Sequence, residues 1–191
     1  MSKGRLEAFS DGVIAILITI MVLELRVPDG ADPAALGSLL PVFLSYVLSF
    51  IYLGIYWNNH HHLFQLVQTV NGRVLWANMH LLFWLSLVPF VTAWMGENGF
   101  AAWPVALYGV VLLLAAVAYF ILTRALLAVH SVDSPLGKAL GRDIKGKISV
   151  LSYLVAMPLA FFVPWMSGVI YVAVALLWFV PDRRMERTLA G

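Results

Sequence analysis

Long apolar runs separated by short polar segments dominate the chain, and they are typical of membrane-spanning helices. They predict helices over residues 5–26, 39–70, 74–95, 101–123, 148–163 and 165–181. The last two come from one uncharged run, which as a single helix would be about 50 Å long and too long for one crossing. Pro164 to Gly168 breaks this run, so we expect a hairpin of two short helices or, alternatively, a re-entrant pair. The pattern predicts an all-α integral membrane protein with six transmembrane helices in one domain, residues 1–191.

The composition agrees with this pattern. Of 191 residues, 62% are hydrophobic and only 12% are charged, and the mean hydropathy is +0.89, far from the values of soluble domains. A net charge of +2 does not favour a nucleic-acid partner, so the expected surroundings are a lipid bilayer. The chain contains no cysteine, which excludes disulfides, thiolate metal sites and cysteine nucleophiles.

The basic residues indicate the orientation of the helices. Of 12 lysines and arginines, Arg26 alone falls on the outer side of the six-helix scheme. Because cytoplasmic loops carry an excess of Lys and Arg, we expect a multi-pass protein of the plasma membrane with both termini in the cytoplasm. The remaining basic residues are Lys3, Arg5, Arg73, Arg124, Lys138, Arg142, Lys145, Lys147, Arg183, Arg184 and Arg187.

The first helix carries an acidic residue at each end of its apolar segment. Residues 12–23 cover about 18 Å of a hydrocarbon core that is about 30 Å thick, so Asp11 lies at membrane depth. An ionisable group there needs a partner. Candidate partners on the same side are Arg5, Asn58, Asn59, His60, His61, His62, Asn78 and His80. Such groups either lock the first three helices together or form a proton relay, and the residues alone leave both open.

One face of the first helix is wholly aliphatic. At 100° per residue, Ile16, Ile20 and Leu23 lie within about 60° of one another, and Thr19 borders them. Around a symmetry axis these side chains would form stacked rings, a hydrophobic constriction that gates by dewetting. Periodicity alone favours packing or lipid contact, because nearly every residue from 12 to 23 is apolar.

Other polar features are less specific. Glu24 would form an acidic ring at an outer mouth if the helix lines a pore, but pairing with Arg26 or simple solvation is equally compatible. The consecutive His60, His61 and His62 are a weak metal signal, because neighbours on a helix point about 100° apart. We therefore expect neither a bound metal nor another cofactor.

The motif Arg5-x-x-x-Phe9-Ser10-Asp11-Gly12, continuing to Glu24, resembles the first-helix signature of the transmembrane protein 175 channel family. Trp57, the His-His-Leu-Phe of residues 61–64 and the Ser-Leu-Val-Pro-Phe of residues 86–90 extend the resemblance through the first three helices. The last three helices match only in number and hydrophobicity.

The resemblance implies a potassium-permeable channel and not an enzyme. It implies six helices per repeat, a pore lined by the first helix, and no carbonyl filter. Since the signature occurs once, four copies are expected to assemble, by analogy with the bacterial branch of the family. Potassium ions would be the permeant species, with modest selectivity over sodium because no ring of carbonyls replaces their hydration.

The resemblance also assigns roles to residues. It places the constriction at Ile16, Ile20 and Leu23, with Thr19 at a hydroxyl position associated with selectivity and the outer mouth near Glu24. The residues it implies as a brace for the first helix are Arg5, Phe9, Ser10 and Asp11, facing Trp57, Asn78 and either His61 or His62.

Two other functions compete with the channel on the residues alone. A proton-coupled secondary transporter would use Asp11 and the membrane histidines, although no inverted repeat is visible between the first and last three helices. A membrane enzyme that uses the histidine cluster is a third possibility. It would need a metal or an activated nucleophile, and the sequence displays neither.

Overall fold

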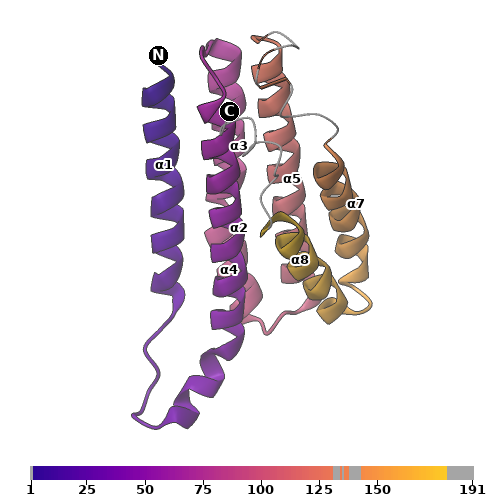
Figure 1. Ribbon diagram of the computed structural model, residues 1–191. Coiled ribbons are helices and arrows are strands. Elements are labelled where there is room, and N and C mark those ends of the chain that lie inside the picture. The colour runs from indigo at the N-terminus through magenta and orange to yellow at the C-terminus, as the bar shows by residue number, and fades with distance from the viewer. Residues whose placement is uncertain (1, 131–133, 135, 138–142, 180–191) are drawn as a thin grey trace.

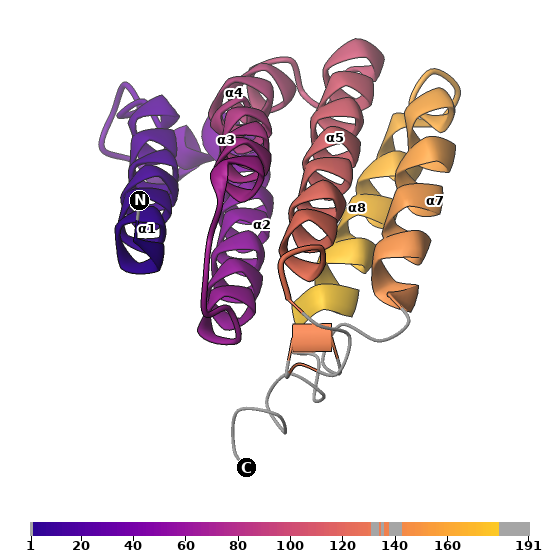
Figure 2. The same cartoon turned by 90° about the horizontal axis from the view of Figure 1, so that it is seen from above.

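The computed structural model describes residues 2–130, 134, 136, 137 and 143–179, and in this part of the chain all regular structure is helical. The helices stand side by side in a row (Figures 1 and 2). Helix α1 (Lys3–Ile20) lies at one edge of this row, and α7 (Ile144–Leu159) and α8 (Pro164–Phe179) lie at the other. The helices between them are α2 (Leu40–Gln65), α3 (Gly72–Ser86), α4 (Val88–Glu97) and α5 (Ala102–Leu127). The expected all-α fold is confirmed.

Among the described residues, four helical segments are long and apolar enough to cross a membrane: Lys3–Glu24, Pro33–Gln65, Gly72–Glu97 and Ala102–Leu127. Helices α7 and α8 have 16 residues each. At 1.5 Å per residue each is about 24 Å long, somewhat shorter than a hydrocarbon core of about 30 Å. The chain is therefore a multi-pass membrane protein whose last two helices are short.

Two helix ends differ from the sequence-based ranges. Helix α2 ends at Gln65 and not at residue 70, and the backbone N–H of Gln68 donates to His130 Nε2 at 3.1 Å. Helix α7 begins at Ile144 and not at residue 148, because the Asp143 carboxylate accepts the backbone N–H of Gly146 at 2.8 Å. A contact from a distant segment thus holds the chain just after α2, and a local cap starts α7.

Two further helices end or bend inside their expected ranges. The expected helix over 74–95 is divided into α3 and α4 at Leu87, because Pro89 has no N–H to continue the hydrogen-bond ladder. The first helix tightens into a 3₁₀ turn, η1 (Met21–Glu24), and ends before residue 26. A second 3₁₀ segment, η2 (Pro33–Leu39), leads into α2. Outside the described residues lie positions 180 and 181 of the expected last helix, and Lys138, Arg142, Arg183, Arg184 and Arg187.

Four buried tyrosines, which we call the tyrosine cluster, connect the helices at the α7–α8 side. They are Tyr52, Tyr108, Tyr153 and Tyr171. The Tyr52 hydroxyl donates to the Tyr171 backbone carbonyl at 2.7 Å and lies 3.3 Å from the Tyr153 hydroxyl, which donates to it. The Tyr171 hydroxyl donates to the carbonyl of Val105 at 3.0 Å. Side chains and backbone of α2, α5, α7 and α8 are thereby joined in one buried unit.

Candidate functional site

Helix α1 has one buried and one exposed face. Its buried residues recur every three or four positions and pack toward α2, α3 and α4. They are Leu6, Ser10, Ile14, Leu17 and Met21. The expected constriction residues lie on the other side of the helix, where Ile16 is 62%, Ile20 46% and Leu23 75% exposed. Within one chain, an apolar stripe therefore remains uncovered.

Thr19 lies on the same uncovered side and is exposed. Its hydroxyl is 3.0 Å from the carbonyls of both Ala15 and Ile16 in the preceding turn, so its proton is used inside the helix. The lone pairs of the hydroxyl oxygen remain available beside the aliphatic side chains. The stripe thus carries one oxygen that could contact a cation.

A buried chain of hydrogen bonds fixes the opposite face of α1. Asn78 of α3 donates its Nδ2 to the Ser10 hydroxyl at 2.9 Å, and Ser10 donates to the carbonyl of Leu6 at 2.9 Å. The Asn78 Oδ1 lies 2.8 Å from His60 Nε2 of α2. Because an amide oxygen only accepts, His60 Nε2 carries the proton and donates. We call Ser10, Asn78 and His60 the buried brace.

A second contact to α1 is partly open to solvent. The indole Nε1 of Trp57 donates to Asp11 Oδ1 at 3.1 Å, and Asp11 is half-buried. The Trp57 ring stacks on His61 with centroids 5.8 Å apart and an interplanar angle of 14°. His61 Nε2 in turn lies 2.8 Å from Gln65 Nε2. Asp11 therefore has a direct partner on α2, and His61 supports that partner.

The structure brings only some of the expected bracing residues together. Arg5 and Phe9 are exposed, and no hydrogen bond or ion pair reaches Arg5 within the described residues. His62 is half-buried beside His61, with ring centroids 5.9 Å apart. Neither His61 nor His62 reaches Asn78; His60 does.

The sequence contained a signal for His60 that our assignment did not use. Ser45, Ser49 and Leu53 recur every four residues on the buried face of α2, and His60 follows Leu53 by about two helical turns. The helix phase thus selects the first of the three histidines. The three rings also take different partners, and within the described ranges no group of three or more potential ligands could hold a metal ion.

The outer end of α1 lies beside the end of α4. Arg26 pairs with Glu97 at 3.4 Å, so the considered pairing of Arg26 with Glu24 is wrong. Glu24 is exposed and, with Glu97, lines a groove of about 510 Å³ between the end of α1 and α4. Two carboxylates therefore stand at this end, one of them held by an arginine.

The chain is similar to proteins that are named as potassium channels. Residues 5–89 match the family model described as endosomal/lysosomal potassium channel TMEM175. A potassium channel from a Chryseobacterium species is 53% identical over 189 residues, covering 99% of this chain and 98% of that protein.

Two further similarities extend the comparison to structure and to animal proteins. The crystal structure of a lysosomal potassium-selective channel TMEM175 homolog from Chamaesiphon minutus is 31% identical, with a TM-score of 0.80 over 94% of this chain and 97% of that one. The mouse endosomal/lysosomal proton channel TMEM175 is 36% identical over 116 residues, which are 54% of this chain and 23% of the mouse protein. Since the similarity to the Chryseobacterium protein extends over nearly the whole of both chains, the present chain belongs to the TMEM175 potassium channel family.

Proposed function

We propose that this protein is a potassium-permeable cation channel in which four copies place α1 around a central pore. The observation that carries the proposal is the uncovered apolar stripe of α1, in a chain that is 53% identical to a protein named as a potassium channel. The family is one of ion channels, and the proposed activity is permeation without catalysis.

The position of α1 in the fold supports a central place. It forms one edge of the helix row, while α7 and α8 form the other (Figure 2). If α1 faces the symmetry axis, Ile16, Ile20 and Leu23 of four copies form three successive apolar rings. From Ile16 to Leu23 the helix rises about 11 Å, which sets the length of the constriction.

Permeation through such rings is passive. Cations would enter near Glu24, lose part of their water at Leu23, Ile20 and Ile16, and leave past Phe9. Potassium holds its water less strongly than sodium, so a narrow apolar segment favours potassium. The preference is modest, because apart from the Thr19 hydroxyl the stripe offers no oxygen ligands to replace the hydration shell.

Contacts between copies can involve α3 and α4. Trp76 and Phe83 are exposed seven residues apart on α3, and Phe90 is exposed on α4 beyond the break at Leu87. Seven residues are about two helical turns, so Trp76 and Phe83 lie on one side of α3 and form an exposed aromatic stripe. We propose that this stripe packs against a neighbouring copy once α1 is at the axis.

We place the channel in the plasma membrane with both termini in the cytoplasm. The support is the distribution of basic residues, of which Arg26 alone is on the outer side. The ends of α2, α3 and α5 that carry His60, Arg73 and Arg124 would then face the cytoplasm.

A second candidate permeant ion comes from the names of the animal relatives. The mouse protein is named as a proton channel, so protons are proposed to pass through the same pore. A proton-coupled transporter is the more distant alternative. It would require Asp11 or His60 to leave its present hydrogen-bonded partner during transport.

The test is ion flux through the purified protein in liposomes. We expect a passive current whose reversal potential follows the potassium gradient and shifts when sodium replaces potassium on one side. A third condition with only a proton gradient measures proton permeation. Transport that requires a proton gradient and carries no passive potassium current would contradict the channel and support the transporter.

A further inference from the structure

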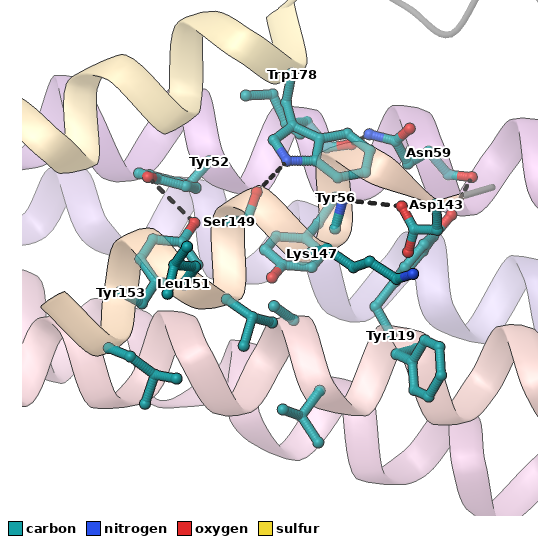
Figure 3. A pocket seen from close by; sticks show the side chains of 17 residues that line it. Tyr52, Tyr56, Asn59, Tyr119, Asp143, Lys147, Ser149, Leu151, Tyr153 and Trp178 are labelled. Carbon is teal, nitrogen blue, oxygen red and sulfur yellow. Dashed lines mark hydrogen bonds between the residues drawn. The ribbon is translucent and has the colours of Figure 1, made fainter.

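A pocket of about 410 Å³ lies between α2, α5, α7 and α8 (Figure 3). None of the constriction residues and none of the buried brace lines it. Ligand-binding pockets commonly have volumes of about 300–1,000 Å³, so this space has room for a small apolar group. Because the chain is a membrane protein, lipids are the molecules that surround these helices.

The pocket differs in polarity from one end to the other. Asn59 and Asp143 are gathered at one end in Figure 3, and Tyr52, Tyr153 and Leu151 lie toward the other. Its walls are mostly aliphatic and aromatic. Leu151, Leu154 and Phe120, which belong to the lining, are also exposed on the surface of the protein. The pocket is therefore open at an apolar rim, where a hydrocarbon chain could enter from the bilayer.

The first turns of α7 supply positive charge to the polar end. Lys147 lines the pocket, and its side chain forms no hydrogen bond or ion pair within the described residues. The Nζ atom of Lys145 lies 5.8 Å from the ring centroid of Trp178, another lining residue. The acid of this region, Asp143, already accepts the Gly146 N–H at 2.8 Å. Because the Asp143 carboxylate already accepts this N–H, the ammonium group of Lys147 is the charge that favours an anionic group here.

The hydroxyl of Tyr56 offers a second donor. Tyr56 lines the pocket, is half-buried and packs edge-on against Tyr119, with ring centroids 6.3 Å apart. Its hydroxyl has no hydrogen-bond partner in the described part of the chain. By contrast, the Tyr119 hydroxyl donates to the carbonyl of Asn59 at 3.2 Å. An acceptor bound in the pocket would give the Tyr56 hydroxyl a partner.

We propose that this pocket binds a phospholipid, with one acyl chain between the apolar walls and the phosphate at Lys147. Helix α7 starts well short of the end of α5 (Figure 1), and the long side chain of a lysine in its first turns can extend from there toward the level of the lipid headgroups. Basic pockets between transmembrane helices bind lipid headgroups in this way. The site does not depend on ion conduction.

Native mass spectrometry of the purified protein with three probes tests the proposal. The probes are dioleoyl phosphatidic acid, dioleoylglycerol without phosphate, and glycerol phosphate without acyl chains. We expect phosphatidic acid to bind about tenfold more tightly than dioleoylglycerol, and glycerol phosphate not to compete. Equal binding of the two lipids, or displacement by glycerol phosphate, would overturn the proposal.

Variants test the phosphate-binding end and the apolar walls of the pocket separately. Lys147→Gln should remove the preference for phosphatidic acid, Lys147→Arg should retain it, and Lys3→Gln is the matched control on α1. Ala116→Phe should fill the pocket and weaken both lipids, whereas Ala173→Phe on the exposed side of α8 should not. Unchanged lipid binding by Ala116→Phe, or by Lys147→Gln, in a protein of normal melting temperature would contradict the site.

Discussion

The two edges of the helix row are held in the molecule by different means. Helix α1 is attached through the buried brace and the bond from Trp57 to Asp11, and its opposite face is uncovered. Helix α8 is attached through Tyr171, which is fully buried and bonded to both α2 and α5. The inner side of the α8 edge, which we call the packed edge, is joined by buried hydrogen bonds within one chain, although the outer faces of α7 and α8 also carry exposed apolar side chains. The α1 edge leaves its apolar stripe uncovered in a single chain.

This difference indicates that one edge of the molecule supports the fold and the other takes part in permeation. The tyrosine cluster needs no further copy of the chain to be buried, so the α5–α7–α8 region can act as a rigid support. The stripe of α1 can be covered only by lipid, water or another copy. Under the proposed assembly, the uncovered edge is the one that contains the pore, and the brace sets how α1 presents the stripe.

Enlarging Gly109 is expected to have the largest effect, because it breaks the packed edge. A Cβ atom at this position would overlap the Tyr171 hydroxyl and lie 3.0 Å from Met157 Cγ. We expect Gly109→Val to lower the free energy of unfolding by about 3 kcal/mol, measured by thermal unfolding in detergent. Gly168→Val on α8, where a Cβ would meet nothing within 4 Å, is the control. Equal stability of the two variants would refute this view of the packed edge.

Removing Asn78 should weaken the other edge. Asn78→Leu leaves the buried His60 N–H without an acceptor, at a cost of about 2 kcal/mol. We expect easier dissociation of the oligomer in native mass spectrometry and a lower melting temperature. Asn58→Leu changes the same residue type at a position with no interhelical hydrogen bond in the described chain, and should change little. If both variants dissociate alike, the brace does not hold α1.

Replacing Ile16 should alter permeation and leave the fold intact. An asparagine in the proposed ring would hold water in the constriction, so Ile16→Asn is expected to raise the conductance several-fold and reduce the preference for potassium. Single-channel currents measure the first effect and reversal potentials the second. Ile16→Val keeps the ring apolar and should conduct like the native protein. Unchanged currents in Ile16→Asn would remove Ile16 from the pore.

The smallest effect is expected at Asp11. Asn retains an oxygen that can accept the Trp57 N–H, so Asp11→Asn loses only the additional strength of a charged acceptor, about 1 kcal/mol or less. We expect near-normal currents and a slightly lower melting temperature. A folded variant that instead loses only pH-coupled transport would support the transporter.

The sequence predicted the apolar stripe of α1 and the all-α fold, because helical periodicity and long apolar runs are local properties. It did not predict that α2 ends at Gln65, nor that the chain just after this helix is bonded to His130, because that contact comes from a distant segment. The break before Pro89 and the cap at Asp143 could have been predicted from these two residue types, but the boundaries were taken from the hydrophobic pattern alone. The pairing of His60 with Asn78 depends on the relative rotation of two helices, which one helix's pattern only partly determines.

The most direct measurement uses the absence of native cysteine. Ile16→Cys is compared with Leu151→Cys, which is exposed on α7 at the packed edge. If α1 lines the pore, a water-soluble thiol reagent should block the current of Ile16→Cys while potassium flows and leave Leu151→Cys unaffected. Block of neither variant, or of Leu151→Cys alone, would contradict the central claim that the uncovered stripe of α1 faces the ions.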